Sequence, residues 1–85
     1  NLRPVFVTKH VYDYQGYSRV VKEQHIKFVV HQHNGTVVDG IGFGLADKID
    51  IVQKGPFDMV YTLDENEFNG VTKLQIKVLD IRQSI

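Results

Sequence analysis

Apolar residues recur at every second position through most of this 85-residue chain, and the period changes only once. The clearest stretch is residues 25–31, where Ile26, Phe28 and Val30 alternate with a set made mostly of His and Lys. Because successive side chains of a strand point to opposite faces, this stretch predicts a strand with one apolar face and one largely cationic face.

The same alternation, broken by turn residues, predicts five strands in all. They are expected at residues 4–14, 19–32, 36–43, 57–63 and 72–82. Asn34-Gly35 predicts a tight hairpin between the second and third strands, because both positions of a type I′ turn require positive φ. Residues 64–70 predict a polar loop.

The single change of period lies between the third and fourth strands. Leu45, Ile49 and Val52 stand at helical spacing, and Gly55 and Pro56 follow where a helix would have to end. Residues 45–54 therefore predict one short helix.

Glycines alternate with apolar residues along the third strand. Gly40, Gly42 and Gly44 form one set, with Ile41 and Phe43 in the other. Glycines on one face of a strand indicate a bend, a bulge or the close approach of another backbone, as a barrel corner requires. Their spacing fits neither of the phosphate-binding glycine motifs.

The order of elements predicts a mainly β fold of one domain: a five-stranded OB-like barrel with one short helix between strands 3 and 4. An SH3-like barrel with an inserted helix has the same elements and stays open as the alternative.

Several classes of function lack support in the residues. The chain has no cysteine, which excludes disulfides and cysteine-based zinc sites and is compatible with a reducing, cytoplasmic location. His31 and His33 lack a third ligand nearby in sequence, and no apolar run is long enough to span a membrane. We expect solvated charges at the scattered carboxylates Asp47, Asp50, Asp58 and Asp64, and no catalytic or metal site, no cofactor and no membrane partner.

Charge is distributed unevenly although ten basic residues balance ten acidic ones. The charged residues within 9–33 are mostly basic, and those within 39–67 are mostly acidic. This uneven distribution predicts a positive face on a neutral domain. Such a face could follow a phosphate backbone through Arg19, His25, Lys27, Lys73 and Lys77, with Tyr12, Tyr14, Tyr17 and Phe68 available to stack on bases. The alternative is an ordinary half-exposed sheet with solvated lysines and packed tyrosines.

Five segments, in order, carry a resemblance that spans nearly the whole chain. They are Arg3-Pro4-Val5-Phe6-Val7, His25-Ile26-Lys27-Phe28, Val38-Asp39-Gly40-Ile41-Gly42-Phe43-Gly44, Asn66-x-Phe68-x-Gly70 and Leu74-Gln75-Ile76-x-x-x-Asp80-Ile81-Arg82. Together they resemble the C-terminal OB-type domain of the RecJ family of exonucleases, which are specific for single-stranded DNA. The chain departs from that family at Phe68, where Trp is frequent, and at Gln83, where Pro is frequent.

The resemblance implies a parent enzyme that degrades single-stranded DNA from 5′ to 3′ in DNA repair and recombination, with a Mn- or Mg-dependent Asp-His-His core that this chain lacks. Residues 1–85 are then expected to be a C-terminal piece of a larger, cytoplasmic multidomain nuclease. Its expected partners are single-stranded DNA and the catalytic domains of the same parent chain. The expected DNA-binding residues are Arg19, His25, Lys27, Phe68, Lys73, Gln75 and Lys77. A structural or protein-docking module that packs against those catalytic domains is the alternative.

Overall fold

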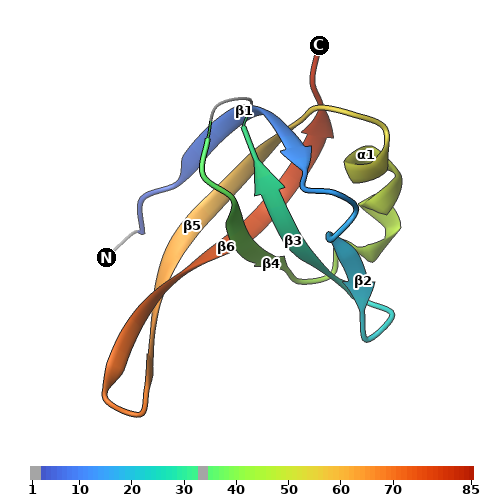
Figure 1. Ribbon diagram of the computed structural model, residues 1–85. Helices are drawn as coiled ribbons and strands as arrows, with labels where there is room; N and C mark the ends of the chain where they lie inside the picture. The colour runs from blue at the N-terminus through green and yellow to red at the C-terminus, as the bar shows by residue number, and fades with distance from the viewer. Residues whose placement is uncertain (1–2, 33–34) are drawn as a thin grey trace.

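The computed structural model describes residues 3–32 and 35–85, except for the side chains of Asn66 and Phe68. Its elements, in chain order, are β1 (Phe6–Asp13), β2 (Arg19–Val21), β3 (His25–His31), β4 (Val38–Gly42), a 3₁₀ turn η1 (Ala46–Lys48), α1 (Ile49–Gln53), β5 (Phe57–Phe68) and β6 (Val71–Gln83) (Figure 1). Within the described ranges, no helix is long and apolar enough to cross a membrane.

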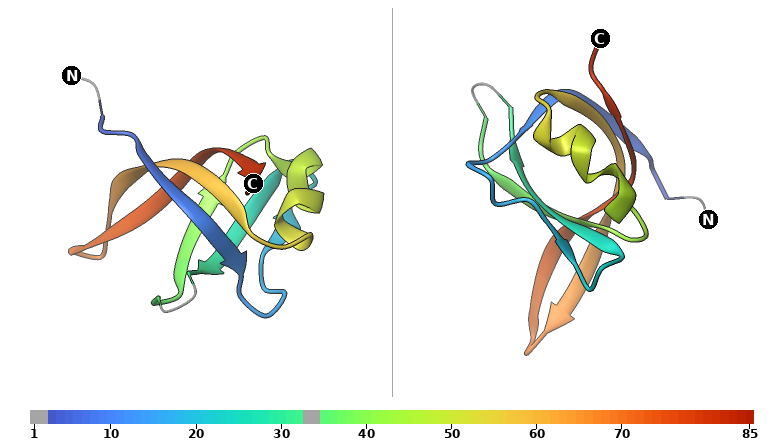
Figure 2. Two further views of the ribbon diagram at one scale, coloured as in Figure 1. Left: turned by 90° about the horizontal axis from the view of Figure 1, so that it is seen from above. Right: turned by 90° about the vertical axis from the view of Figure 1, so that its right-hand side faces the viewer.

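The strands close into a barrel because β1 pairs with strands on both of its sides. The order is β1-β5-β6-β4-β3, and β1 also pairs with β3, with Tyr12 opposite His31. The pairing of β4 with β6 is parallel, and all the others are antiparallel. The predicted mainly β, OB-like barrel is confirmed, with its short helix between β4 and β5; Figure 2 shows this helix across one end of the barrel.

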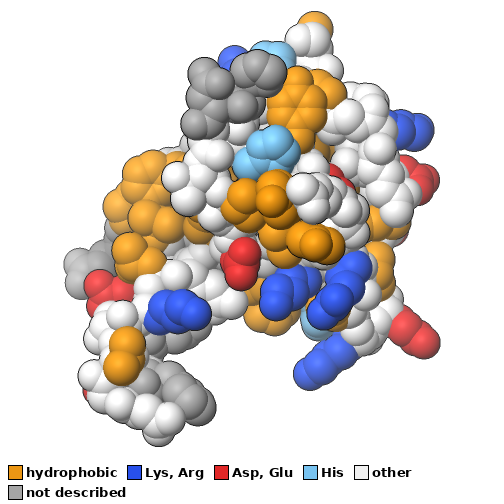
Figure 3. All heavy atoms as spheres, viewed as in Figure 1, with side chains coloured by type: hydrophobic (Ala, Val, Ile, Leu, Met, Phe, Trp, Pro, Cys, Tyr) orange, Lys and Arg blue, Asp and Glu red, His pale blue; other side chains and the backbone are white. Residues whose placement is uncertain are grey.

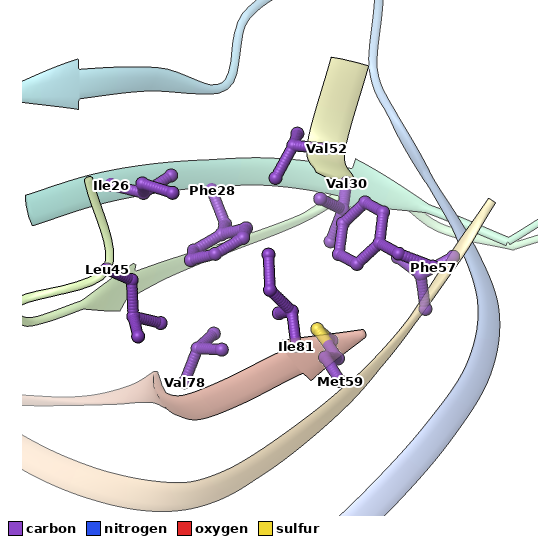
Figure 4. Close-up of a cluster of buried hydrophobic side chains, with 10 residues drawn as sticks. Ile26, Phe28, Val30, Leu45, Val52, Phe57, Met59, Val78 and Ile81 are labelled. Carbon is purple, nitrogen blue, oxygen red and sulfur yellow. The ribbon is translucent and has the colours of Figure 1, made fainter. Parts of the chain in front are cut away.

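The core lies inside the barrel, on the face that the alternation predicts. Ile26, Phe28 and Val30 are fully buried there, and Phe57 from β5 and Val52 from α1 meet them (Figure 4). Burying each side chain of this size contributes about 1.5–3 kcal/mol. The core therefore holds both the barrel wall and the helix that covers its end.

Of the three alternatives for the glycines of β4, the close approach of another backbone is found at Gly40, where an added Cβ atom would lie 3.1 Å from Ile76 O. Gly40 and Gly42 are buried and face the core. A Cβ atom on Gly42 would lie 2.6 Å from Leu45 Cδ1 and 2.8 Å from Phe28 Cε2. β4 thus lies against the core through its backbone, so its larger side chains point outward.

The predicted second strand is wrong in one respect, because it is two strands, β2 and β3. The chain turns between them, where Lys22 and Glu23 have φ of 52° and 61°. These values lie in the left-handed region, so the extended path breaks and β2 folds back to pair with β3. The polar side chains at this turn need no burial, which is why the chain can leave the sheet there.

The predicted polar loop at residues 64–70 is also wrong. β5 continues to Phe68 and pairs with β6 as far as Val71. The turn itself has only two residues, Asn69 and Gly70, with φ of 53° and 77°, as a type I′ hairpin requires. The two strands form an arm that projects beyond the barrel in Figure 1. The hairpin predicted at Asn34-Gly35 falls partly on residues outside the described ranges.

One of the scattered carboxylates is not the solvated charge that was expected. Asp58 is only 5% exposed and accepts hydrogen bonds from Ser84 Oγ at 2.6 Å, His10 N at 3.2 Å and Arg82 Nε at 3.1 Å. These donors stabilise the charged form, the bond from Ser84 most strongly, and lower its pKa from 3.8 to about 2. Asp58 therefore ties β1 and the end of β6 to β5.

Candidate nucleic-acid interface

Strand pairing brings cations from three strands into one row on the outside of the sheet. Arg19 of β2 lies opposite Lys27 of β3, Lys27 lies opposite Ile41 of β4, and Ile41 lies beside Lys77 of β6. Residues paired in this way share a face of the sheet, and Lys73 and Gln75 share the face of Lys77 because they alternate along β6. We call Arg19, Lys27, Lys73 and Lys77 the basic strip.

A groove lies between β4 and the base of the β5–β6 arm, where those two elements diverge. Its volume is about 480 Å³, and Lys27, Lys73 and Gln75 line it together with Asp39, Phe43 and Leu74. Figure 3 shows Lys and Arg side chains gathered on this face, over β2 and β3 and beside the arm. Predicted residues that lie about fifty positions apart in sequence thus meet around one hollow.

Phe43 is the residue at this site that sequence reasoning missed. Its side chain is 57% exposed, and its ring centroid lies 5.0 Å from that of His25 and 5.8 Å from Lys77 Nζ. Alternation with Ile41 suggested an ordinary apolar face. The alternating glycines were the available sequence signal, because a strand face made of glycines permits close approach of another segment, and the structure shows that Gly40 and Gly42 lie on the inner face.

His25 is half-buried at the start of β3 and contacts the turn that follows β4. Its Nδ1 accepts a hydrogen bond from Gly44 N at 2.9 Å. A neutral imidazole that accepts at Nδ1 carries its proton on Nε2, so this side chain can still donate one hydrogen bond to a ligand. His25 is therefore a contact of Phe43 and of the turn as well as a neighbour of the strip.

The three predicted tyrosines do not join this group. Tyr14 lies 5.7 Å from Tyr17 and 5.5 Å from His31, and Tyr12 lies 6.1 Å from His31, all ring to ring. This cluster adjoins the far end of β3 from His25. The Phe68 side chain lies outside the described residues, as do His33 and Asn34.

A metal centre would need a group of ligand side chains, and the described part of the chain has none. Within residues 3–32 and 35–85, no three His, Cys, Asp or Glu side chains are grouped so that they could hold an ion. The site is instead an open groove with lysines, an amide, a carboxylate and one exposed ring. Such a set can bind an anionic, aromatic ligand by charge and stacking, without covalent chemistry.

Comparison with known families agrees with this fold. The family model of the RecJ OB domain matches residues 1–80, which include the whole groove and every residue of the basic strip. No curated protein and no solved structure matches the chain. The chain belongs to the RecJ OB-domain family.

Proposed function

We propose that this domain is the single-stranded-DNA-binding accessory module of a RecJ-like 5′-to-3′ exonuclease that acts in DNA repair and recombination. The observation that carries the proposal is a groove at which Lys27 and Lys73 of the basic strip meet the exposed Phe43 ring, with Lys77 over that ring. Lysine and arginine bind phosphates, and an exposed ring binds unpaired bases. The two requirements of single-strand binding therefore meet in one place.

The charge of the domain sets the strength of this binding. The chain is neutral overall, and Asp39 lies in the groove among the lysines. With up to four phosphate contacts and little long-range attraction, affinity is expected in the micromolar range or weaker. Duplex DNA is expected to bind less well, because its bases are paired and cannot stack on a side chain.

In the parent protein, the proposed role of the domain is to hold the single strand and lead it to the catalytic domains of the same chain. Those domains would supply the Mn- or Mg-dependent chemistry, and this domain contributes no catalytic group. We also propose that the parent protein is cytoplasmic, as expected from the sequence.

A fluorescence anisotropy titration tests the proposal. A labelled single strand of about 15 nucleotides, a length matched to an OB fold, and its duplex are each titrated with the domain at about 50 and 200 mM salt. We expect binding that weakens with salt and favours the single strand. Absence of binding at the lower salt concentration, or a preference for the duplex, would refute the proposal.

A second role is favoured by an apolar surface away from the groove. Val5 and Val7 are 57% and 58% exposed, and Val7 lines a separate hollow with the half-buried Val60, the buried Ile81 and the charged residues Asp58, Asp80 and Arg82. Contiguous exposed apolar side chains favour docking against another protein surface. We propose that this surface packs against the catalytic domains of the parent, which leaves the groove open. A calorimetric titration of those domains with the wild-type domain and with Val7→Glu tests this role, and equal affinities would contradict it.

A further inference from the structure

We propose that Phe43 is the base-stacking residue of the groove and that His25 is its positioning residue. This inference rests on the proposed single-strand binding and names how the bases are held. The sequence suggested Phe68 and the tyrosines for that role, whereas the structure places Phe43 beside the cations.

The surroundings of the Phe43 ring leave it able to stack. The side chain is 57% exposed although it is large and apolar. Lys77 Nζ lies over the ring, 5.8 Å from its centroid, and the His25 ring meets it edge to face at an interplanar angle of 74°. The ring is thus held by neighbours yet open to solvent, as a platform for an unpaired base must be.

His25 fixes the backbone that carries the ring. Phe43 directly follows β4, and the next residue, Gly44, adopts a left-handed φ of 73°. Gly44 N donates its hydrogen bond to His25 Nδ1 at 2.9 Å. The same imidazole therefore contacts the Phe43 ring and holds the turn after it, which limits the directions that the ring can take.

The position of Lys77 adds a geometric argument. An ammonium group over the ring lies within reach of the phosphate next to a base that stacks there. One nucleotide can then place its base on Phe43 and its phosphate at Lys77. The ligand class is an unpaired nucleotide strand, and stacking is tolerant of base identity because every base has a π face.

Conservative variants separate stacking from charge. Phe43→Leu keeps an apolar side chain but removes the ring, and we expect affinity for a single strand to fall about 5- to 150-fold with an unchanged salt slope. Phe43→Trp is expected to retain binding, and its fluorescence is expected to be quenched when the strand binds. Phe6→Leu is the matched control, because Phe6 is an exposed ring that stacks on Tyr61, away from the groove.

A double-mutant cycle tests the positioning role of His25. His25→Leu removes the acceptor for Gly44 N, and it should weaken binding in the wild type but not in the Phe43→Leu background. His25→Asn keeps an acceptor at the same distance along the side chain and should restore part of the lost affinity. Additive effects of the two single changes would overturn the positioning role.

The outcomes distinguish this inference from the proposed function. If Phe43→Leu binds like the wild type while salt-dependent binding persists, the stacking role is wrong and the basic strip stands. If the wild type does not bind single strands at all, both the stacking role of Phe43 and the proposed single-strand-binding function are wrong. Circular dichroism melts of each variant identify any loss of binding that is due to unfolding.

Discussion

Replacing Lys27 and Lys77 together with glutamine tests whether the basic strip contacts phosphates. The four cations of the strip predict a log–log slope of affinity against salt of about −2.8 for a single strand. The variant keeps Arg19 and Lys73, so its slope should be about −1.4. Between about 50 and 200 mM salt, the affinity of the wild type then falls about 50-fold and that of the variant about sevenfold.

Anisotropy titrations of a labelled single strand at several salt concentrations give both slopes. The matched control is Lys9→Gln with Lys54→Gln, because both lysines are exposed, lie outside the strip and change the net charge equally. The control is expected to keep the wild-type slope. An unchanged slope in the strip variant would refute the reasoning, and an equal decrease in both variants would show a general charge effect instead of a path for the strand.

Three further predictions concern stability and chemistry. Gly42→Ala should lower the free energy of unfolding by about 1–3 kcal/mol in a urea titration, because the new Cβ meets Leu45 and Phe28; no loss would contradict the close packing. The pKa of Asp58 is depressed from 3.8 to about 2, so its stabilising effect is complete above about pH 4 and disappears as pH falls toward about 2. The free energy of unfolding of Asp58→Asn should lack this part of the pH dependence. Identical curves of unfolding free energy against pH for the wild type and the variant would contradict the role of Asp58. The domain alone should leave 5′-labelled single strands intact with Mn²⁺ or Mg²⁺, and shortening that survives repurification would disprove this.

Local pattern was sufficient for the elements whose signals are short-range. The alternation at residues 25–31 identifies β3 and its buried face, because a half-buried strand must place its apolar residues on one side. The change of period after Phe43 identifies the helical segment at residues 46–53. The basic residues of the strip could also be named from sequence, since alternation assigns each of them to the face opposite the core.

Turns were harder, because their backbone angles depend on the strands they join. Asn69-Gly70 is the same signal as Asn34-Gly35, but the acidic residues before it hid the strand that leads into it. Pairing with β6 makes residues 64–68 a strand, since they lie opposite residues 71–75 and every second one exchanges backbone hydrogen bonds with β6. Lys22 and Glu23 are not residue types that indicate a left-handed turn. They adopt positive φ because β2 folds back to pair with β3.

The site itself was decided by tertiary structure. Alternation along β4 yields two faces but does not say which faces the core, and the barrel resolves this by burying Gly42 against Leu45 and Phe28 and Gly40 against Ile76. Phe43 is consequently turned outward. The parallel pairing of β4 with β6 then places Lys77 beside that ring, although more than thirty positions separate them in the chain. Contacts of this range depend on how the whole barrel closes. The sequence by itself determined the two alternating sets of residues in each strand, and closure determined which set of β4 faces outward and which outer residues meet.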